Sequence, residues 1–177
     1  MNTFLVSISC SDRTGLIAQI AGRLFDLGVN LGDTAFAALA GDAEFSTVCD
    51  VPQTVPVTKL EAELSGLPLL VGATVKVVPF RPHDPQAPSN RVTHRIVVSG
   101  GDRPGLIARL SEALVQYGAN IVRLDAHRFP EHGGHRYVTR IDAAVPKRSA
   151  DACLATIGNT AGELALDCHW EAVEDGG

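Results

Sequence analysis

The feature that most constrains the fold of this chain is an internal repeat, in which its two halves resemble each other at an offset of 90 positions. Residues 4–32 align with residues 94–122, and ten of these 29 pairs are identical. Seven of the ten identities fall in residues 9–18, which align with residues 99–108. A repeat of this density indicates a duplicated structural unit. The sequence therefore predicts two domains of about 80 residues rather than one large domain.

A proline series separates the two copies of the repeat. The prolines recur at every third position, at Pro79, Pro82, Pro85 and Pro88. Period three is typical of an extended, stiff polyproline II helix, which favours a spacer over a PxxP ligand for another domain. We assign the first domain to residues 1–81, the linker to residues 82–92 and the second domain to residues 93–177.

The hydrophobic pattern changes period in the same order in each copy. Alternation predicts strands, and a spacing of three and four predicts helices. In the first copy we expect a strand at 4–9, a helix at 16–27, a hairpin of 30–39 and 44–51, a helix around 60–67 and a strand at 69–79. In the second we expect a strand around 96–98, a helix after Pro104, a hairpin of 120–129 and 136–145, a helix at 150–161 and a strand at 164–173. The β-α-β-β-α-β order predicts the α+β class, as two tandem ferredoxin-like domains, each an antiparallel sheet with both helices on one face.

Composition argues against direct contact with nucleic acid or a membrane. Fifteen Lys and Arg stand against 20 Asp and Glu, and the nine aromatic residues are too few to indicate an RNA-stacking surface. No apolar run approaches the roughly 18 residues of a membrane helix, and the N-terminus lacks the pattern of a signal peptide. Four cysteines without a CxxC pair indicate reduced thiols, so we expect a cytoplasmic protein without a cofactor.

Two kinds of chemistry compete with a purely regulatory role. A small acyl-phosphate hydrolase on this fold would use Arg13 or Arg103, but the glycine-rich phosphate cradle is missing. Three histidines with zinc-like spacing, His127, His132 and His135, gather with Glu131 around one predicted hairpin. The first copy has no equivalent histidines, so we expect solvated loop residues and no metal.

The duplicated Asp-Arg-x-Gly-Leu-Ile-Ala loop is the candidate binding site. It precedes a helix whose first N–H groups are unpaired and can receive a carboxylate. Asp12 can accept a hydrogen bond from an ammonium group, Gly15 permits close approach of the backbone, and Asn30 can donate and accept. Together these groups suit a small zwitterion, an amino acid. The same residue types also cap and end helices, so a structural role stays open.

The two loops resemble the signature of ACT domains. Ser-Asp-Arg-Thr-Gly-Leu-Ile-Ala precedes Gly-Val-Asn-Leu in the first copy, and Gly-Asp-Arg-Pro-Gly-Leu-Ile-Ala precedes Gly-Ala-Asn-Ile in the second. With the proline-rich linker, nearly the whole chain resembles the tandem-ACT family of the glycine cleavage system transcriptional repressor. The resemblance implies binding of small effectors at interfaces between paired domains.

The resemblance also implies a set of ligand-binding residues in each copy. They are Asp12, Arg13, Gly15, Leu16, Ile17, Asn30 and Asp33 in the first, and Asp102, Arg103, Gly105, Leu106, Ile107 and Asn120 in the second. Two positions depart from the pattern: Thr14 replaces a proline, and Arg123 stands where the first copy has Asp33. The second departure puts equal ligand preference of the two copies in doubt.

These observations predict a non-catalytic regulatory protein that binds an amino acid such as glycine or serine and signals to a partner protein. No basic helix-turn-helix remains once both copies are assigned, so transcriptional regulation would act through that partner. Exposed sheet edges and small domains predict a homodimer. The alternatives are a small hydrolase and an ACT interaction module that has no ligand.

Overall fold

A computed structural model describes residues 1–81 and 91–173 of the chain. The chain divides into two compact units, Met1–Asp84 and Pro85–Gly177, each of which has its own hydrophobic core. The predicted spacer at residues 82–92 lies outside the described residues except for its last two positions. Its polyproline conformation therefore stays a prediction.

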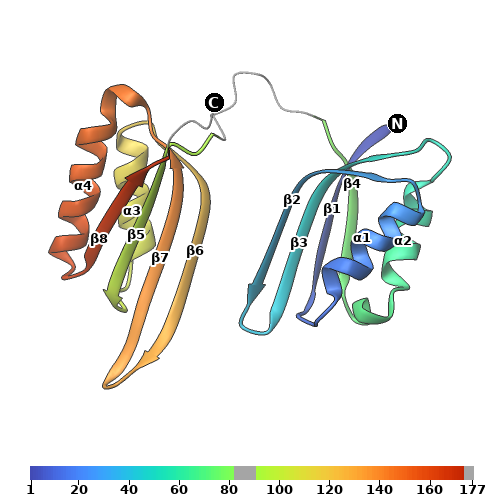
Figure 1. Cartoon of the computed structure of the whole chain (residues 1–177), viewed down its shortest axis with the longest axis horizontal. Helices are drawn as coiled ribbons and strands as arrows, with labels where there is room; N and C mark the ends of the chain where they lie inside the picture. Colours follow the sequence, from blue (N-terminus) through green and yellow to red (C-terminus); the bar gives the residue numbers. More distant parts are fainter. Residues whose placement is uncertain (82–90, 174–177) are drawn as a thin grey trace. The chain divides into compact units, whose positions relative to one another are not determined.

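The first unit is a four-stranded sheet with two helices (Figure 1). Its elements are β1 (Asn2–Ser11), α1 (Leu16–Asp26), β2 (Asn30–Leu39), β3 (Asp42–Val51), α2 (Val57–Ser65) and β4 (Thr74–Pro79). The strands lie in the order β2-β3-β1-β4, and every neighbouring pair is antiparallel. This is the arrangement that the periodicity predicts.

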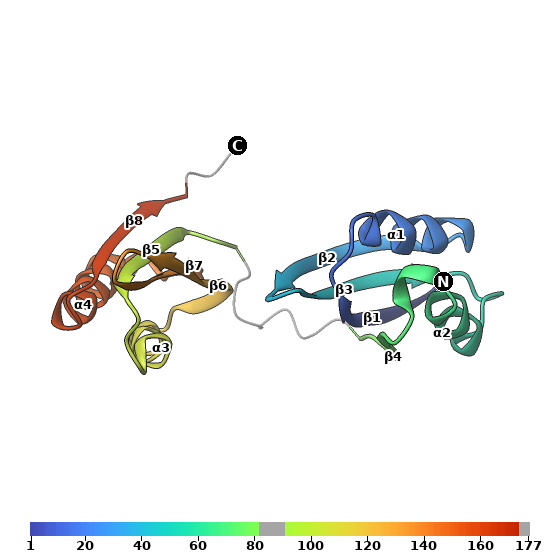
Figure 2. The same ribbon diagram turned by 90° about the horizontal axis from the view of Figure 1, so that it is seen from below.

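The second unit repeats this architecture, with both helices on one face of the sheet (Figure 2). Its elements are β5 (His94–Gly101), α3 (Leu106–Gln116), β6 (Asn120–Glu131), β7 (Gly134–Ala144), α4 (Ala150–Glu163) and β8 (Asp167–Ala172). The order β6-β7-β5-β8 is equivalent to that of the first unit, and it is again antiparallel. The predicted α+β class with two ferredoxin-like repeats is confirmed.

Each core forms where the alternate apolar residues of a strand pack against the apolar residues that recur every three or four positions in a helix. In β1 the alternate residues Phe4, Val6 and Ile8 are buried, and Ile20 and Leu24 on α1 are fully buried against that face. The residues between them point to the opposite, helix-free face of the sheet. We call that surface the open face of each unit.

The closing strands begin later than the sequence predicts. A short 3-10 helix at Pro68–Leu70 and Gly72, whose φ is 81°, occupy the segment before β4. Ala165, whose φ is 55°, interrupts the extended chain before β8. A positive φ is incompatible with a strand, so each strand begins only after that residue.

The second hairpin is longer than predicted. The predicted strands stop at residue 129 and resume at residue 136, whereas β6 extends to Glu131 and β7 begins at Gly134. Only two residues are left for the turn, and Gly133 adopts a φ of 93° there. Among the described residues, no helix is long and apolar enough to cross a membrane.

Candidate functional site

The loop between β1 and α1 presents the start of a helix without a side-chain cap. Gly15, whose φ is 89°, is the capping residue, and no side chain, that of Asp12 included, caps the helix. The Leu16 N–H donates to the carbonyl of Arg13 at 3.2 Å. Within the described ranges, the next two N–H groups, of Ile17 and Ala18, have neither a backbone acceptor nor a capping side chain. They are free to receive an anionic group.

The second unit reproduces this backbone. Gly105 has a φ of 79° and also lacks a side-chain cap, and the Leu106 N–H donates to the Arg103 carbonyl at 3.2 Å. Among the described residues, the N–H groups of Ile107 and Ala108 have no acceptor in a turn or cap. A left-handed residue before the helix explains why both loops carry glycine.

The predicted set contains two residues whose side chains lie in the core. Leu16 and Leu106 are each only 2% exposed, so their side chains cannot contact a ligand at the surface. Ile17 and Ile107 are 45% and 37% exposed and lie beside the free N–H groups. Of these four residues, the isoleucines therefore provide the apolar side chains next to the candidate site.

The charged side chains of the two loops differ in their contacts. In the first unit Asp12 and Arg13 are exposed, and neither forms an ion pair or side-chain hydrogen bond with another described residue. In the second unit Asp102 accepts a hydrogen bond from Arg128, a residue of β6. Arg103 donates from Nε to the carbonyl of Leu164 at 3.1 Å. The two motifs are therefore alike in backbone but not in charge.

The two predicted asparagines lie far from the loops of their own units. Asn30 begins β2 opposite Asp50, at the end of the sheet where β1 begins, whereas Asp12 follows the other end of β1. The ten residues of β1 span about 30 Å at about 3.3 Å per residue. Asn120 has the equivalent position at the start of β6. One unit alone therefore does not bring the loop and the asparagine together.

Asp33 and its counterpart Arg123 lie beside irregularities of their strands. Gly32 and Asp33 together oppose the single residue Val48, which is a β-bulge. A Cβ on Gly32 would lie 3.0 Å from the Val48 carbonyl oxygen, which is a tight contact. Arg123 lies just after the bulge of β6 and donates to Asp125 at 3.0 Å. The position is therefore acidic in one unit and basic in the other.

The thiol nearest to the first loop is not an activated nucleophile. Cys10 lies near the end of β1, where burial raises its pKa, although Arg13 lowers it in part. Burial likewise raises the pKa of Cys49, Cys153 and Cys168, and all four cysteines are free. A nucleophilic cysteine needs a lowered pKa instead. The loop therefore lacks this form of covalent catalysis.

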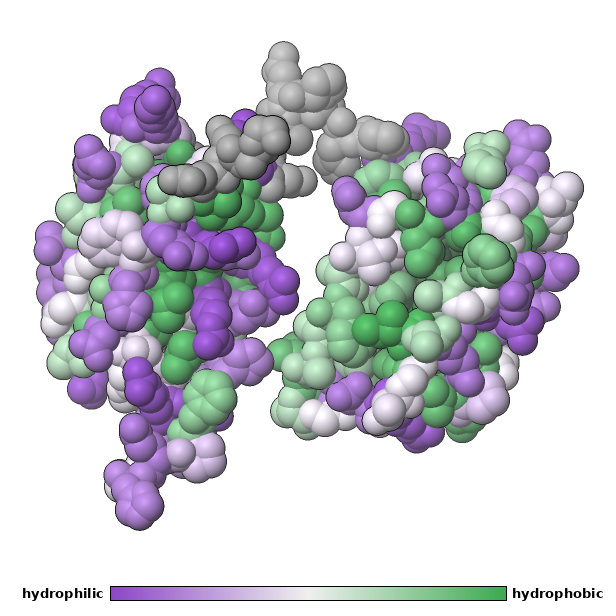
Figure 3. Space-filling model, in the orientation of Figure 1, coloured by the Kyte–Doolittle hydropathy of each residue, from purple (hydrophilic) through white to green (hydrophobic). Residues whose placement is uncertain are grey.

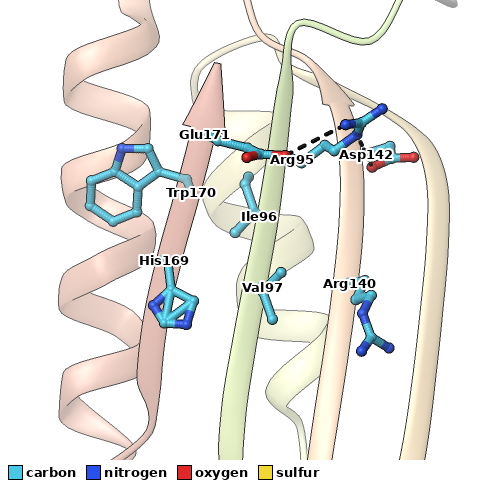
Figure 4. Close-up of a pocket in the computed structure, with 8 residues that line it drawn as sticks. All are labelled: Arg95, Ile96, Val97, Arg140, Asp142, His169, Trp170 and Glu171. Atoms are coloured by element: carbon cyan, nitrogen blue, oxygen red, sulfur yellow. Dashed lines mark hydrogen bonds and ion pairs between the residues drawn. The ribbon is translucent and has the colours of Figure 1, made fainter. Parts of the chain in front are cut away.

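Sequence reasoning missed a groove on the open face of the second unit (Figure 4). It has a volume of about 380 Å³ and is lined by Arg95, Ile96, Val97, Arg140, Asp142, His169, Trp170 and Glu171. Arg95 lies 3.8 Å from Asp142 and 3.5 Å from Glu171. Hydrophilic side chains also cover the face of this unit over β6 and β7 (Figure 3). Charged residues that alternate with apolar ones in β7, where Arg140 and Asp142 flank Ile141, are the signal that could have revealed this face.

The three histidines of the second hairpin do not form a cluster. His127 opposes Val138 in the ladder, His135 opposes Pro130, and His132 lies in the turn. In the described part of the chain, no three His, Cys, Asp or Glu residues are placed to hold a metal ion. These histidines therefore contribute nothing to the candidate site.

Comparison with known proteins relates this geometry to one family. Residues 94–150 match the family model of the ACT domain, as the motifs predict. The chain is similar in fold to an unknown protein from Galdieria sulphuraria, with 20% identity, 98% of this chain and 99% of that chain covered, and a TM-score of 0.76. It is also similar to a protein assigned as a glycine cleavage system transcriptional repressor, with 15% identity, 98% of both chains covered and a TM-score of 0.67. No curated protein matches the sequence significantly.

Proposed function

With an ACT domain in its second unit and the same fold in its first, we propose that this protein is a non-catalytic regulator that binds a small amino acid. Glycine and serine are the candidate effectors. The free groups of the loop suit a carboxylate and an ammonium group, and these two groups are most of what a small amino acid presents. A similar fold in a glycine cleavage system transcriptional repressor supports a regulatory role of this kind. The ACT match in residues 94–150 supports it independently.

One observation carries the proposal, namely the combination of free groups around Gly15. Two N–H groups at the start of α1 can bind a carboxylate, and the unpaired carboxylate of Asp12 can bind an ammonium group. Ile17, nearly half exposed, can pack against a short side chain. This set recognises both charges of an amino acid at once.

The site is completed when two units pair, because Asp12 and Asn30 lie at opposite ends of β1 in one unit. In an antiparallel pair, the loop of one unit meets the first residues of the edge strand of the other. The partner we propose is a second copy of the chain. The outer edges of β2 and β6 bond to no further strand in the described residues, so each offers backbone groups for such pairing.

The signal passes to another protein rather than to DNA. The chain carries a net charge of −5, which opposes direct binding to phosphates. Each of the two units is one copy of the ACT-like repeat. We therefore propose a cytoplasmic homodimer that binds an amino acid and regulates transcription through a partner protein.

Thermal unfolding in the presence of each of the twenty amino acids tests the proposal. A ligand at 100 times its dissociation constant adds about 2.7 kcal/mol to the free energy of unfolding. We expect glycine or serine to raise the melting temperature of the native chain and to raise that of Asp12→Ala less. If no amino acid raises it, the protein is an interaction module without a ligand. Hydrolysis of an acyl phosphate by the purified chain would instead support the enzyme alternative.

A further inference from the structure

The two copies of the loop differ in one contact that decides which charge a ligand meets. In the second unit the Asp102 carboxylate is bound to the guanidinium of Arg128. In the described part of the first unit, nothing binds the Asp12 side chain, and its backbone N–H donates to the carbonyl of Gly41 at 2.8 Å. The same motif is thus open to a cation in one unit and already neutralised in the other.

The register of the edge strands explains this difference. Arg128 on β6 and Ala38 on β2 occupy equivalent positions. Arg128 opposes Tyr137, which pairs on its other side with Gly100. Ala38 opposes Ala43, which pairs on its other side with Cys10, the equivalent of Gly100. The methyl group of Ala38 carries no charge and cannot reach a carboxylate in the loop. A single residue on the edge strand therefore distinguishes the two sites.

The second unit also fixes the other charge of its motif. Arg103 donates to the Leu164 carbonyl, whereas Arg13 in the first unit has no such bond within the described residues. Both charged side chains of the second loop are thus engaged by the protein itself, and both of the first are available.

We propose that Arg128 is a specificity-determining residue that competes with the ammonium group of a ligand for Asp102, so that the first unit binds the amino acid more tightly than the second. This inference rests on the proposed function. An ammonium group entering the second loop has to displace the guanidinium and then meets its positive charge nearby. The free N–H groups of α3 still offer a place for a carboxylate, so only one half of an amino acid is recognised there.

The expected difference between the units follows from the exposure of this ion pair. Arg128 and Asp102 are 56% and 41% exposed, so water screens their attraction. Because a ligand can displace such an exposed pair, the pair lowers the affinity for an ammonium ligand by up to about fivefold. The same exposure means that removal of Arg128 should leave the fold intact.

Amide resonances of Gly15 and Gly105 can report on the two loops separately in the full chain labelled with ¹⁵N. Glycine and serine are the probes. In the native protein we expect the Gly15 signal to shift at a concentration about two- to fivefold below that needed for Gly105. In Arg128→Ala, Gly105 should shift in the same range as Gly15, and calorimetry should show two sites of equal affinity per chain in place of two unequal ones.

Arg95→Ala is the matched control, because Arg95 is as exposed as Arg128 and forms ion pairs with Asp142 and Glu171 on the open face instead of with Asp102. It should leave both titrations unchanged. The inference is overturned if both glycines shift together in the native protein, or if Gly105 does not respond to Arg128→Ala while Gly15 binds normally. If neither glycine shifts in either protein, amino-acid binding itself is excluded and the proposed function fails with it.

Discussion

Leu5 and Arg95 occupy equivalent central positions in the two sheets but have opposite surroundings. Leu5 pairs across the sheet with Val48 on β3 and Val78 on β4, so an apolar row crosses the open face of the first unit. Arg95 pairs at the same positions with Asp142 and Glu171, which form ion pairs with it. One fold therefore carries an apolar row on the open face of one copy and a charged row at the equivalent position of the other.

Transplanting the apolar row into the second unit should change its stability little. We expect the triple variant Arg95→Leu, Asp142→Val and Glu171→Val to unfold in urea within about 1 kcal/mol of the native protein, because exposed ion pairs contribute little. Ile96→Ala on the same strand is the control and should cost about 2–5 kcal/mol, since Ile96 is 1% exposed. A loss above about 2 kcal/mol in the triple variant would show that the charged row is structurally important.

Two glycines next to and within α1 should respond to alanine with opposite signs. Gly15→Ala should destabilise the first unit by about 1–2 kcal/mol, because its φ of 89° is unfavourable for a residue with a Cβ. Gly22→Ala should stabilise it by about 0.5–1 kcal/mol, because Gly22 lies inside the helix and a Cβ there meets nothing within 4 Å. Thermal unfolding of both variants measures the difference, and equal signs would contradict the assigned loop conformation.

Asp12→Ala and Asn30→Ala should each weaken amino-acid binding about tenfold or more, although the two residues lie at opposite ends of β1. Each removes one hydrogen bond to a charged group of the ligand, and the site uses both when two units pair. Calorimetric titration with glycine and serine measures the effect. Asp26→Ala, an exposed carboxylate at the end of α1, is the control and should bind normally. Normal binding by Asn30→Ala would exclude a site shared between units.

Cys49 should make the stability of the first unit depend on alkaline pH. Burial raises the pKa of this thiol from 9.0 to about 11, with a smaller contribution from Asp50. Between these two pH values the folded state holds a proton that the unfolded state has lost, so stability falls as the pH rises from about 9 to about 11. Urea unfolding at pH 8, 9.5 and 11 measures this loss. The decline should be shallower in Cys49→Ala, and an equally steep decline would assign it to other groups.

The fold was largely predictable because each element is encoded by a local period. The alternation of apolar residues in β1 and the spacing of Ile20 and Leu24 in α1 are visible in the sequence. Because the unit is duplicated, the same pattern occurs a second time and supports the assignment of each element. The starts of β4 and β8 were wrong because Gly72 and Ala165 adopt positive φ values. Nothing in the hydrophobic pattern indicates that change of backbone conformation.

The candidate site was predictable only in its backbone. The glycine and the free N–H groups follow from a loop that opens a helix, and they occur at Gly15 and Gly105 as predicted. The core positions of Leu16 and Leu106 could have been inferred from the helical period, since each is the first residue of the buried stripe.

By itself, the sequence determined the duplication, the order of the elements and the two loops that begin the helices, because these depend on neighbours within a few residues. Only the tertiary structure decided which loop keeps its charges free. The bond between Arg128 and Asp102 joins residues 26 positions apart, and it exists because the register of β6, β7 and β5 brings them together. Periodicity fixes the face on which each strand residue lies, but it does not distinguish registers that differ by two residues, and cross-strand neighbours depend on that choice.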